Sequence, residues 1–147
     1  MEKDTIRQIQ KKVVELLHEN NNKPLYITSV DNCSEVVRLV GCWIFEKLPQ
    51  SKIYILKGKN IQNTRRCHDI LAVEYNRNIN LIDPTVWQFF KNKKSIFIKT
   101  IDNLANSLFE ANKIYGGKWK ISEILKASNC RKSKLKKIIA SNIKEVK

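Results

Sequence analysis

The sequence predicts an α+β protein in which a buried central helix packs on an antiparallel sheet. An apolar segment from Val36 to Phe45, broken only by Arg38, has the composition of a helix that is covered on all sides. Short apolar runs bounded by turn residues follow it up to about residue 100, as expected for antiparallel strands. Amphipathic helical segments lie before and after these runs. Helices that are separated from strands in this way are typical of α+β proteins.

The length and composition favour a single globular domain. The chain has 147 residues, of which 42% are hydrophobic and 29% charged, and this is enough for one domain with its own core. We expect one domain over 1–147, with an N-terminal helix in 1–20, a core in 25–100 and a helical, basic part in 101–147. The apolar segment of the central helix is too short to span a bilayer. The charged, amphipathic N-terminus does not resemble a signal peptide.

The start of the chain predicts an amphipathic helix followed by an extended segment. Asp4 is a candidate cap for a helix that runs to about Glu19. Its apolar residues share one face: Ile6, Ile9, Val13, Leu16 and Leu17. The polar NNNKP motif ends this helix. The next segment, LYITSV (25–30), reads as a short strand or an extended lead-in.

The central helix is predicted over about 33–48, directly after Asp31 and Asn32. Its apolar positions are spread around the whole helix: Val36, Val37, Leu39, Val40, Cys42, Trp43, Ile44, Phe45 and Leu48. A helix of this kind lies buried in the middle of a domain. Pro49 ends it, because the residue before a proline is disfavoured in the helical conformation.

Four segments in the middle of the chain read as strands. They are KIYILKG (52–58), CHDILAVEY (67–75), INLID (79–83) and KSIFIKT (94–100). The second and third are joined by NRN, which is a turn signal. The PTVWQFF segment (84–90) is expected to form an irregular stretch or a short helix.

The last third of the chain predicts helices and carries most of the charge. Asp102 is a candidate cap for a helix through about Tyr115, which the following Gly-Gly pair stops. Two short basic helices are expected at about 121–128 and 131–145. The net charge of the chain is +14, and residues 118–147 supply +8 of it, from ten Lys or Arg and two Glu. This charge suits nucleic acid, an acidic protein or a membrane surface, and a solvated helix surface explains it equally well.

The cysteines show no spacing that is typical of disulfide frameworks or metal sites. There are four: Cys33, Cys42, Cys67 and Cys130. We therefore expect free thiols and a reducing compartment. Cys42 lies within the apolar helix and is predicted to be an inert core residue. Cys33 differs, because it lies at the polar start of that helix.

Cys33, His68 and Asp83 form a candidate catalytic triad. A cysteine at a helix N-terminus has its thiolate stabilised by the free N–H groups and the helix dipole. His68 begins a predicted strand and can take the proton, and Asp83 ends the next strand and can orient the imidazole. Each residue alone has an ordinary structural explanation, as a core thiol, a strand histidine or a turn acid. Only the three together favour catalysis.

The hairpin register decides whether His68 and Asp83 meet. A two-residue turn at 76–77, or a four-residue turn, pairs residues whose numbers sum to 153, so that Asp83 faces Ile70. His68 then points to the same face as Asp83. A three-residue turn would place the two side chains on opposite faces. The triad hypothesis therefore requires a turn with an even number of residues.

These blocks resemble a known superfamily. NCSEVV, CHDILAVEY and NLIDPTVWQF look like the Cys, His and Asp blocks of the papain-like superfamily in its transglutaminase-like branch. The resemblance covers roughly 25–100, and its most specific part is Asp-Pro-Thr at the end of a strand. It implies a papain-like core with the nucleophile opening the central helix. The small size is most similar to bacterial papain-fold toxins and protein-glutamine deamidase effectors.

The resemblance implies cysteine-dependent acyl transfer at an amide of a protein, without a cofactor. Deamidation, transglutamination and proteolysis all remain open. Papain-type enzymes have a glutamine six residues before the cysteine, but this chain has Ile27 there. An oxyanion hole would then use the Cys33 N–H and a second donor, for which Asn32 is the candidate. The resemblance also implies an effector that is secreted or delivered into a target-cell cytoplasm, and an acidic immunity protein that inhibits it.

Two other classes of function compete with this one. The basic helices expected near the C-terminus would suit a nucleic-acid-binding protein or a nuclease-type toxin, and a protein-interaction module is a further alternative. Cys33, His68 and Asp83 can also be ligands of zinc, but they lack the short spacing of a structural site. No Gly-rich phosphate loop is present. We therefore expect no metal and no cofactor.

Overall fold

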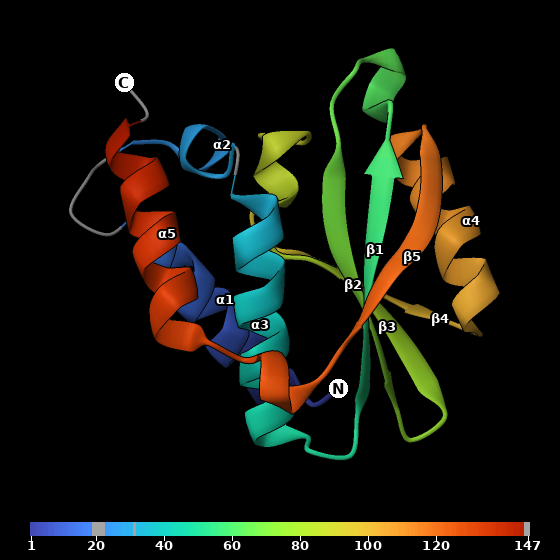
Figure 1. Ribbon diagram of the computed structural model, residues 1–147. Coiled ribbons are helices and arrows are strands. Elements are labelled where there is room, and N and C mark those ends of the chain that lie inside the picture. Colours follow the sequence, from blue (N-terminus) through green and yellow to red (C-terminus); the bar gives the residue numbers. More distant parts are fainter. Residues whose placement is uncertain (19–22, 31, 146–147) are drawn as a thin grey trace.

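The computed structural model describes residues 1–18, 23–30 and 32–145. Over these residues the chain forms one five-stranded antiparallel sheet with helices on both faces (Figure 1). This arrangement confirms the predicted α+β class. The predicted helix end at Glu19 and the predicted position of Asp31 before the central helix lie outside the described residues. No helix in the described part of the chain has the length and apolarity that a membrane crossing requires.

Three helices cover one face of the sheet, namely α1 (Lys3–His18), α3 (Cys33–Lys47) and α5 (Lys132–Glu145). In Figure 1, α3 lies between the sheet and the other two helices. Its buried residues surround the helix, as its composition predicted: Val36, Val37, Leu39, Val40, Gly41, Cys42, Trp43 and Ile44. The central helix is therefore confirmed, and its first residue is Cys33.

The sheet has the strand order β4 (Phe97–Ile101), β3 (Asn78–Asp83), β2 (His68–Tyr75), β1 (Lys52–Lys59) and β5 (Lys118–Leu125). Every neighbouring pair is antiparallel. The four strands predicted in the middle of the chain are therefore present. The fifth strand comes from the C-terminal third.

The two faces of the sheet belong to two hydrophobic clusters. Ile55 and Leu71 pack with α1, α3 and α5, whereas Leu56 and Ile70 pack with α4 (Leu104–Tyr115). Side chains along a strand alternate between the faces, so each strand contributes to both clusters. The same alternation decides to which face of the sheet each polar side chain of a strand points.

The β2–β3 hairpin has the two-residue turn that the triad hypothesis requires. Asn76 and Arg77 both have positive φ, 50° and 64°, which is the backbone of the tight turns that suit the strand twist. Leu71 pairs with Ile82, so the paired numbers sum to 153 as predicted.

Two local predictions in the chain were wrong. The segment predicted as a strand at 25–30 contains a short helix, α2 (Leu25–Thr28), in which Ile27 and Thr28 donate backbone hydrogen bonds to Pro24. A proline just before a helix is well tolerated because it needs no N–H there. The cap of α4 is Asn103 rather than Asp102, since its side chain accepts a hydrogen bond from the Asn106 N–H at 2.9 Å.

The C-terminal third is not wholly helical, because the first predicted basic helix is replaced by β5. In the Lys118–Leu125 segment, charged and apolar residues alternate, and β1 would otherwise be an open edge of the sheet. Edge strands are often rich in lysine, because charge prevents further strand pairing. A short turn of helix at Ala127–Asn129 follows. The second predicted basic helix is present as α5.

The prediction that all four cysteines are free was also wrong. Cys42 of α3 and Cys130, which precedes α5, form a disulfide with their Cα atoms 5.6 Å apart. They are 88 positions apart in the sequence, so only the fold brings them together. Cys33 and Cys67 are the free cysteines. The disulfide removes the basis for expecting a reducing compartment.

Candidate active site

His68 and Asp83 lie side by side in the interior. His68 is the first residue of β2 and Asp83 the last of β3, so the antiparallel hairpin brings them to the same end of the sheet. The His68 Nε2 atom and the Asp83 Oδ2 atom are 2.7 Å apart, and both side chains are fully buried. A buried carboxylate in this position fixes the orientation of the imidazole ring.

Asp83 is held by two further donors. The Thr85 N–H donates to Oδ1 at 3.0 Å, which is the local turn that an Asp-Pro-Thr sequence favours. The Tyr115 hydroxyl donates to Oδ2. Burial, together with the charge and hydrogen bond of Asp83, raises the pKa of Tyr115 well above its ordinary value, so this hydroxyl keeps its proton. Tyr115 could not be identified from the sequence, because it ends a helix that is distant in the chain.

The environment of His68 favours the charged imidazolium. Burial lowers its pKa, but the charge and hydrogen bond of Asp83, with smaller contributions from Cys33, outweigh burial and raise the pKa to about 9. Aromatic rings enclose the imidazole, with centroid distances of 4.8 Å for Phe89, 5.2 Å for Tyr115 and 6.4 Å for Trp119. At neutral pH the ring is therefore protonated in a dry, polarisable pocket.

Cys33 supplies the third member of this group. It is free and half-buried, at the N-terminus of α3. The other ring nitrogen of His68, Nδ1, is buried and makes no hydrogen bond with the described residues. Cys33 nevertheless contributes to the raised pKa of His68, so the thiol lies near the imidazole ring. The fold thus brings together the three residues that the sequence singled out.

Asn32 is occupied by structural contacts. Its Nδ2 donates to the Thr28 carbonyl at 2.6 Å, and its Oδ1 accepts from Asn142 Nδ2 at 3.0 Å. Its backbone N–H donates to the Ser29 carbonyl. These bonds hold the start of α3 to α2 and to α5. An oxyanion-hole role for Asn32 stays a prediction, and its contacts favour positioning of Cys33 instead.

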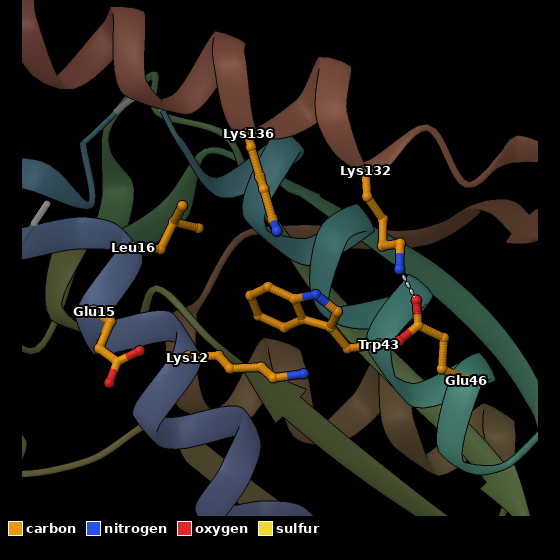
Figure 2. A pocket seen from close by; sticks show the side chains of 7 residues that line it. All are labelled: Lys12, Glu15, Leu16, Trp43, Glu46, Lys132 and Lys136. Carbon is orange, nitrogen blue, oxygen red and sulfur yellow. Dashed lines mark hydrogen bonds and ion pairs between the residues drawn. The ribbon is translucent and has the colours of Figure 1, made fainter.

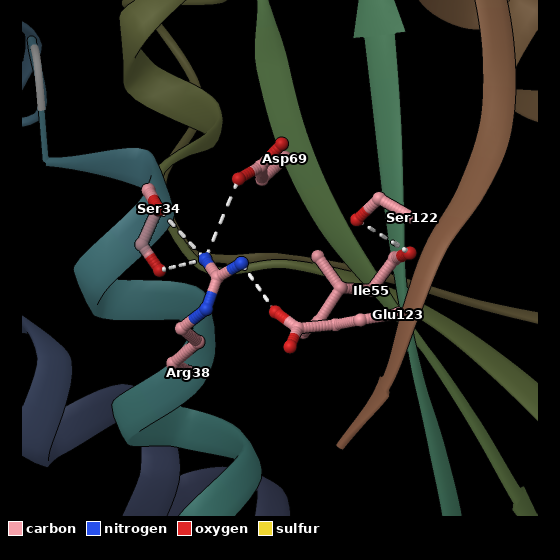
Figure 3. Close-up of polar contacts among 6 residues, drawn as sticks. All are labelled: Ser34, Arg38, Ile55, Asp69, Ser122 and Glu123. Carbon is pink, nitrogen blue, oxygen red and sulfur yellow. Dashed lines mark hydrogen bonds and ion pairs between the residues drawn. The ribbon is translucent and has the colours of Figure 1, made fainter. Parts of the chain in front are cut away.

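An ion-pair network lies one turn along α3 from Cys33. Arg38 donates to the carbonyl and hydroxyl of Ser34 at 2.8 and 2.6 Å. It also forms ion pairs with Asp69, at 3.6 Å, and with Glu123 (Figure 3). Arg38 therefore ties α3 to β2 and β5 beside the candidate site. A lone arginine inside an apolar helix was the sequence signal for this network.

A separate hollow opens between α1, α3 and α5 (Figure 2). Its volume is about 540 Å³, and Trp43 lies at its centre with the Lys12 ammonium 5.1 Å from the ring centroid. Lys132 forms an ion pair with Glu46 at its rim. None of the predicted catalytic residues lines this hollow, which has three lysines and two glutamates in its wall.

Neither a metal site nor a relative gives a further indication of function. Within the described residues, no group of three His, Cys, Asp or Glu side chains is arranged to hold a metal ion. No family model, curated protein or solved structure matches the chain significantly. The geometry of Cys33, His68 and Asp83 is therefore the main guide to function.

Proposed function

We propose that this protein is a cysteine-dependent acyl-transfer enzyme that acts on amide groups of a protein target. The observation that carries the proposal is the buried His68 ring, which is paired with Asp83, lies near the half-buried Cys33 and has a pKa raised to about 9. An imidazolium beside a helix-terminal cysteine favours the reactive thiolate. A structural histidine needs neither a buried carboxylate nor a thiol on its other side.

The geometry supports the following steps. In the resting enzyme the proton of the Cys33 thiol already lies on Nδ1 of His68, and Asp83 stabilises this imidazolium through Nε2. The thiolate forms a C–S bond with the amide carbon, and the tetrahedral intermediate then expels the amine, which takes the proton from Nδ1. Water attacks the thioester while His68 takes one of its protons, and the C–S bond then breaks, which releases the acid product and restores the thiolate–imidazolium pair.

The amide that reacts decides the name of the activity. With a glutamine side chain and water, the products are glutamate and ammonia, and with an amine the product is a crosslink. A main-chain amide would give proteolysis. The resemblance to papain-like effectors favours glutamine deamidation, and it also supports a toxin that is delivered into a target cell and restrained by an immunity protein. The rival proposal of nucleic-acid binding is weakened, since one of its two basic helices is a strand.

Comparison of two cysteine variants tests the proposal. Wild-type, Cys33→Ala and Cys67→Ala proteins would be incubated with a target-cell lysate, and the proteome analysed by mass spectrometry. Cys67 is a matched control, because it is free and exposed and directly precedes His68 in the chain. We expect conversion of glutamine to glutamate, a crosslink or a cleavage with wild type and Cys67→Ala, and none with Cys33→Ala. Equal products from Cys33→Ala would overturn the enzyme proposal.

A further inference from the structure

Four lysines form a compact block at one end of the β1–β5 pair. Lys57 lies directly opposite Lys120, and Lys59 lies opposite Lys118. Lys57 and Lys59 continue the row of Ile53 and Ile55, so they point to the face of the sheet that α3 covers. Figure 1 shows that this end of β1 and the N-terminus of α3 lie toward the same end of the molecule.

No carboxylate among the described residues forms an ion pair with any of these four lysines. Asp69 lies opposite Lys57 on β2, and Glu123 lies nearby on β5. Both carboxylates instead pair with Arg38 (Figure 3). Like charges directly opposite each other on neighbouring strands destabilise a sheet. The edge position of β5 accounts for Lys118 and Lys120, but β1 is an interior strand, so Lys57 and Lys59 lack that explanation.

The lysines surround a small pocket that also has an apolar wall. Its volume is about 120 Å³, and Trp119 lines it together with the four lysines. Trp119 packs over Gly58, where a Cβ atom would lie 2.5 Å from the indole ring, and its Nε1 donates to the Gly116 carbonyl at 2.9 Å. The same indole is part of the aromatic enclosure of His68. Because Trp119 pairs with Gly58, its indole lies on the opposite face of the sheet from the lysine side chains, and Trp119 therefore connects the lysine pocket to the candidate active site across the sheet.

We propose that this lysine pocket binds the carboxylate of an acidic side chain in the protein substrate, so that the enzyme selects amides with Asp or Glu nearby. The identification of the occupant as substrate rests on the proposed function. A pocket of this size accommodates one carboxylate side chain rather than a run of phosphates. Lysine ammonium groups are mobile point charges that accept a carboxylate in several orientations. The apolar stems of the lysines would contact the methylene groups of the same side chain.

Two features favour an acidic protein segment over a nucleic acid. The Trp119 ring is packed against Tyr115, with a centroid distance of 5.5 Å, and so it is not presented as a platform for base stacking. The lysines form a square block on two paired strands, whereas a phosphate backbone needs an extended stripe of positive charge. Nucleic-acid binding is nevertheless an outcome that the test must separate.

The test uses the full-length Cys33→Ala protein, so that binding is measured without turnover. Lys118→Glu/Lys120→Glu reverses two charges on the exposed edge strand, and Lys134→Glu/Lys137→Glu makes the same change in exposed positions of α5. The ligands are a glutamine peptide flanked by glutamates, its counterpart flanked by serines, and a short DNA duplex. We expect the acidic peptide to bind about tenfold or more weakly to the pocket variant and normally to the α5 variant.

Lys118→Arg/Lys120→Arg should restore binding, and circular dichroism would confirm that each variant is folded. Equal binding of the acidic and serine peptides would overturn the proposal, and so would equal losses in the two Glu variants. Loss of DNA binding with retained peptide binding would assign the pocket to nucleic acid instead. In protein that retains Cys33, this thiol should be alkylated rapidly at neutral pH. Weak alkylation and absent turnover, with intact peptide binding, would contradict only the proposed enzymatic function.

Discussion

The most informative residue in the chain is Asp83, because three separate groups donate hydrogen bonds to it. His68, Tyr115 and the Thr85 N–H surround a carboxylate that is wholly buried. A buried charge is stable only when it is paired and hydrogen-bonded, and here His68 and Tyr115 bond to Oδ2 while the Thr85 N–H bonds to Oδ1. The arrangement holds the imidazole in one orientation. It also explains how a buried histidine stays charged.

Replacement of Asp83 by asparagine tests whether catalysis requires the charge of this side chain rather than its size. Asp83→Asn keeps the size of the side chain but removes its charge, so the His68 ring can adopt the wrong tautomer and the imidazolium is no longer stabilised. We expect turnover to fall by about 10³–10⁴-fold, as in triads that lose their acid, and alkylation of Cys33 to slow. Tyr115→Phe is the matched control, since it leaves the carboxylate charged, and its loss should be much smaller. Near-normal turnover in a well-folded Asp83→Asn protein would leave a Cys33–His68 dyad at most.

The charge of His68 should also be visible in the pH dependence of stability. Its pKa rises from 6.5 to about 9 on folding, so the folded state binds this proton more tightly. The stabilisation is fully present below about pH 6.5 and is lost as the pH rises through about 9. It is worth about 3 kcal/mol. Urea denaturation of wild type and His68→Gln from pH 6 to 9.5 measures it, and the difference between the two should shrink with rising pH. A constant difference would show that folding does not raise the pKa of His68.

At the scale of elements, the site depends on a hairpin and a helix that the sequence predicted well. Both were predicted from local features of the sequence. The apolar composition of α3 indicated the helix, and the turn at Asn76 and Arg77 indicated the register of the two strands. The strand β5 was missed because its lysines suit a helix surface as well as a sheet edge. Its position was decided by the open edge of β1, which is a tertiary effect.

Partners that are distant in the sequence could not be predicted for the same reason. Tyr115 reaches Asp83 from α4, and Asn142 reaches Asn32 from α5. The disulfide between Cys42 and Cys130 joins α3 to the segment before α5 across 88 positions. Residue types alone give no such pairings. The catalytic residues were found because each lies at the end of a recognisable element, whereas their supporting residues do not.

The disulfide should contribute a large share of the stability of the helical layer. Closing a loop of 88 residues reduces the entropy of the unfolded chain, and this stabilises the folded state by about 4 kcal/mol. We expect Cys130→Ser to lower the free energy of unfolding by about this amount in urea denaturation. Reductant should have the same effect on wild type and none on the variant. Cys67→Ser is the control and should behave as wild type.

Replacement of the two disulfide cysteines, Cys42 and Cys130, should lower the free energy of unfolding by different amounts. Cys42 is buried in α3, whereas the Cys130 side is partly exposed. Cys42→Ser should therefore cost more than Cys130→Ser, because it also leaves an unpaired hydroxyl in the core. A denaturation curve of wild type that is insensitive to reductant would contradict the assigned role of the bond.

At the scale of the whole molecule, the net charge of +14 is distributed over more than one surface. The lysine pocket lies on the β1–β5 edge, and α5 carries further exposed lysines on the opposite side of the helical layer. Such a field extends about a Debye length into solution and attracts acidic partners before contact. Association with such partners should therefore be fast and sensitive to salt.

This charge leads to a prediction about the inhibitor that a delivered toxin would require. An immunity protein that covers the Cys33 cleft should be acidic, and its association rate constant should exceed the range of about 10⁵–10⁶ M⁻¹s⁻¹ that is typical without steering. Stopped-flow measurements at increasing salt should show this rate constant falling steeply while the dissociation rate changes little. Lys118→Glu/Lys120→Glu should reduce the salt dependence if the inhibitor covers the lysine pocket, and Lys134→Glu/Lys137→Glu should do so if it covers α5. A neutral or basic inhibitor that binds independently of salt would contradict electrostatic steering, because the charge of the chain would then have no part in the recognition of its partner.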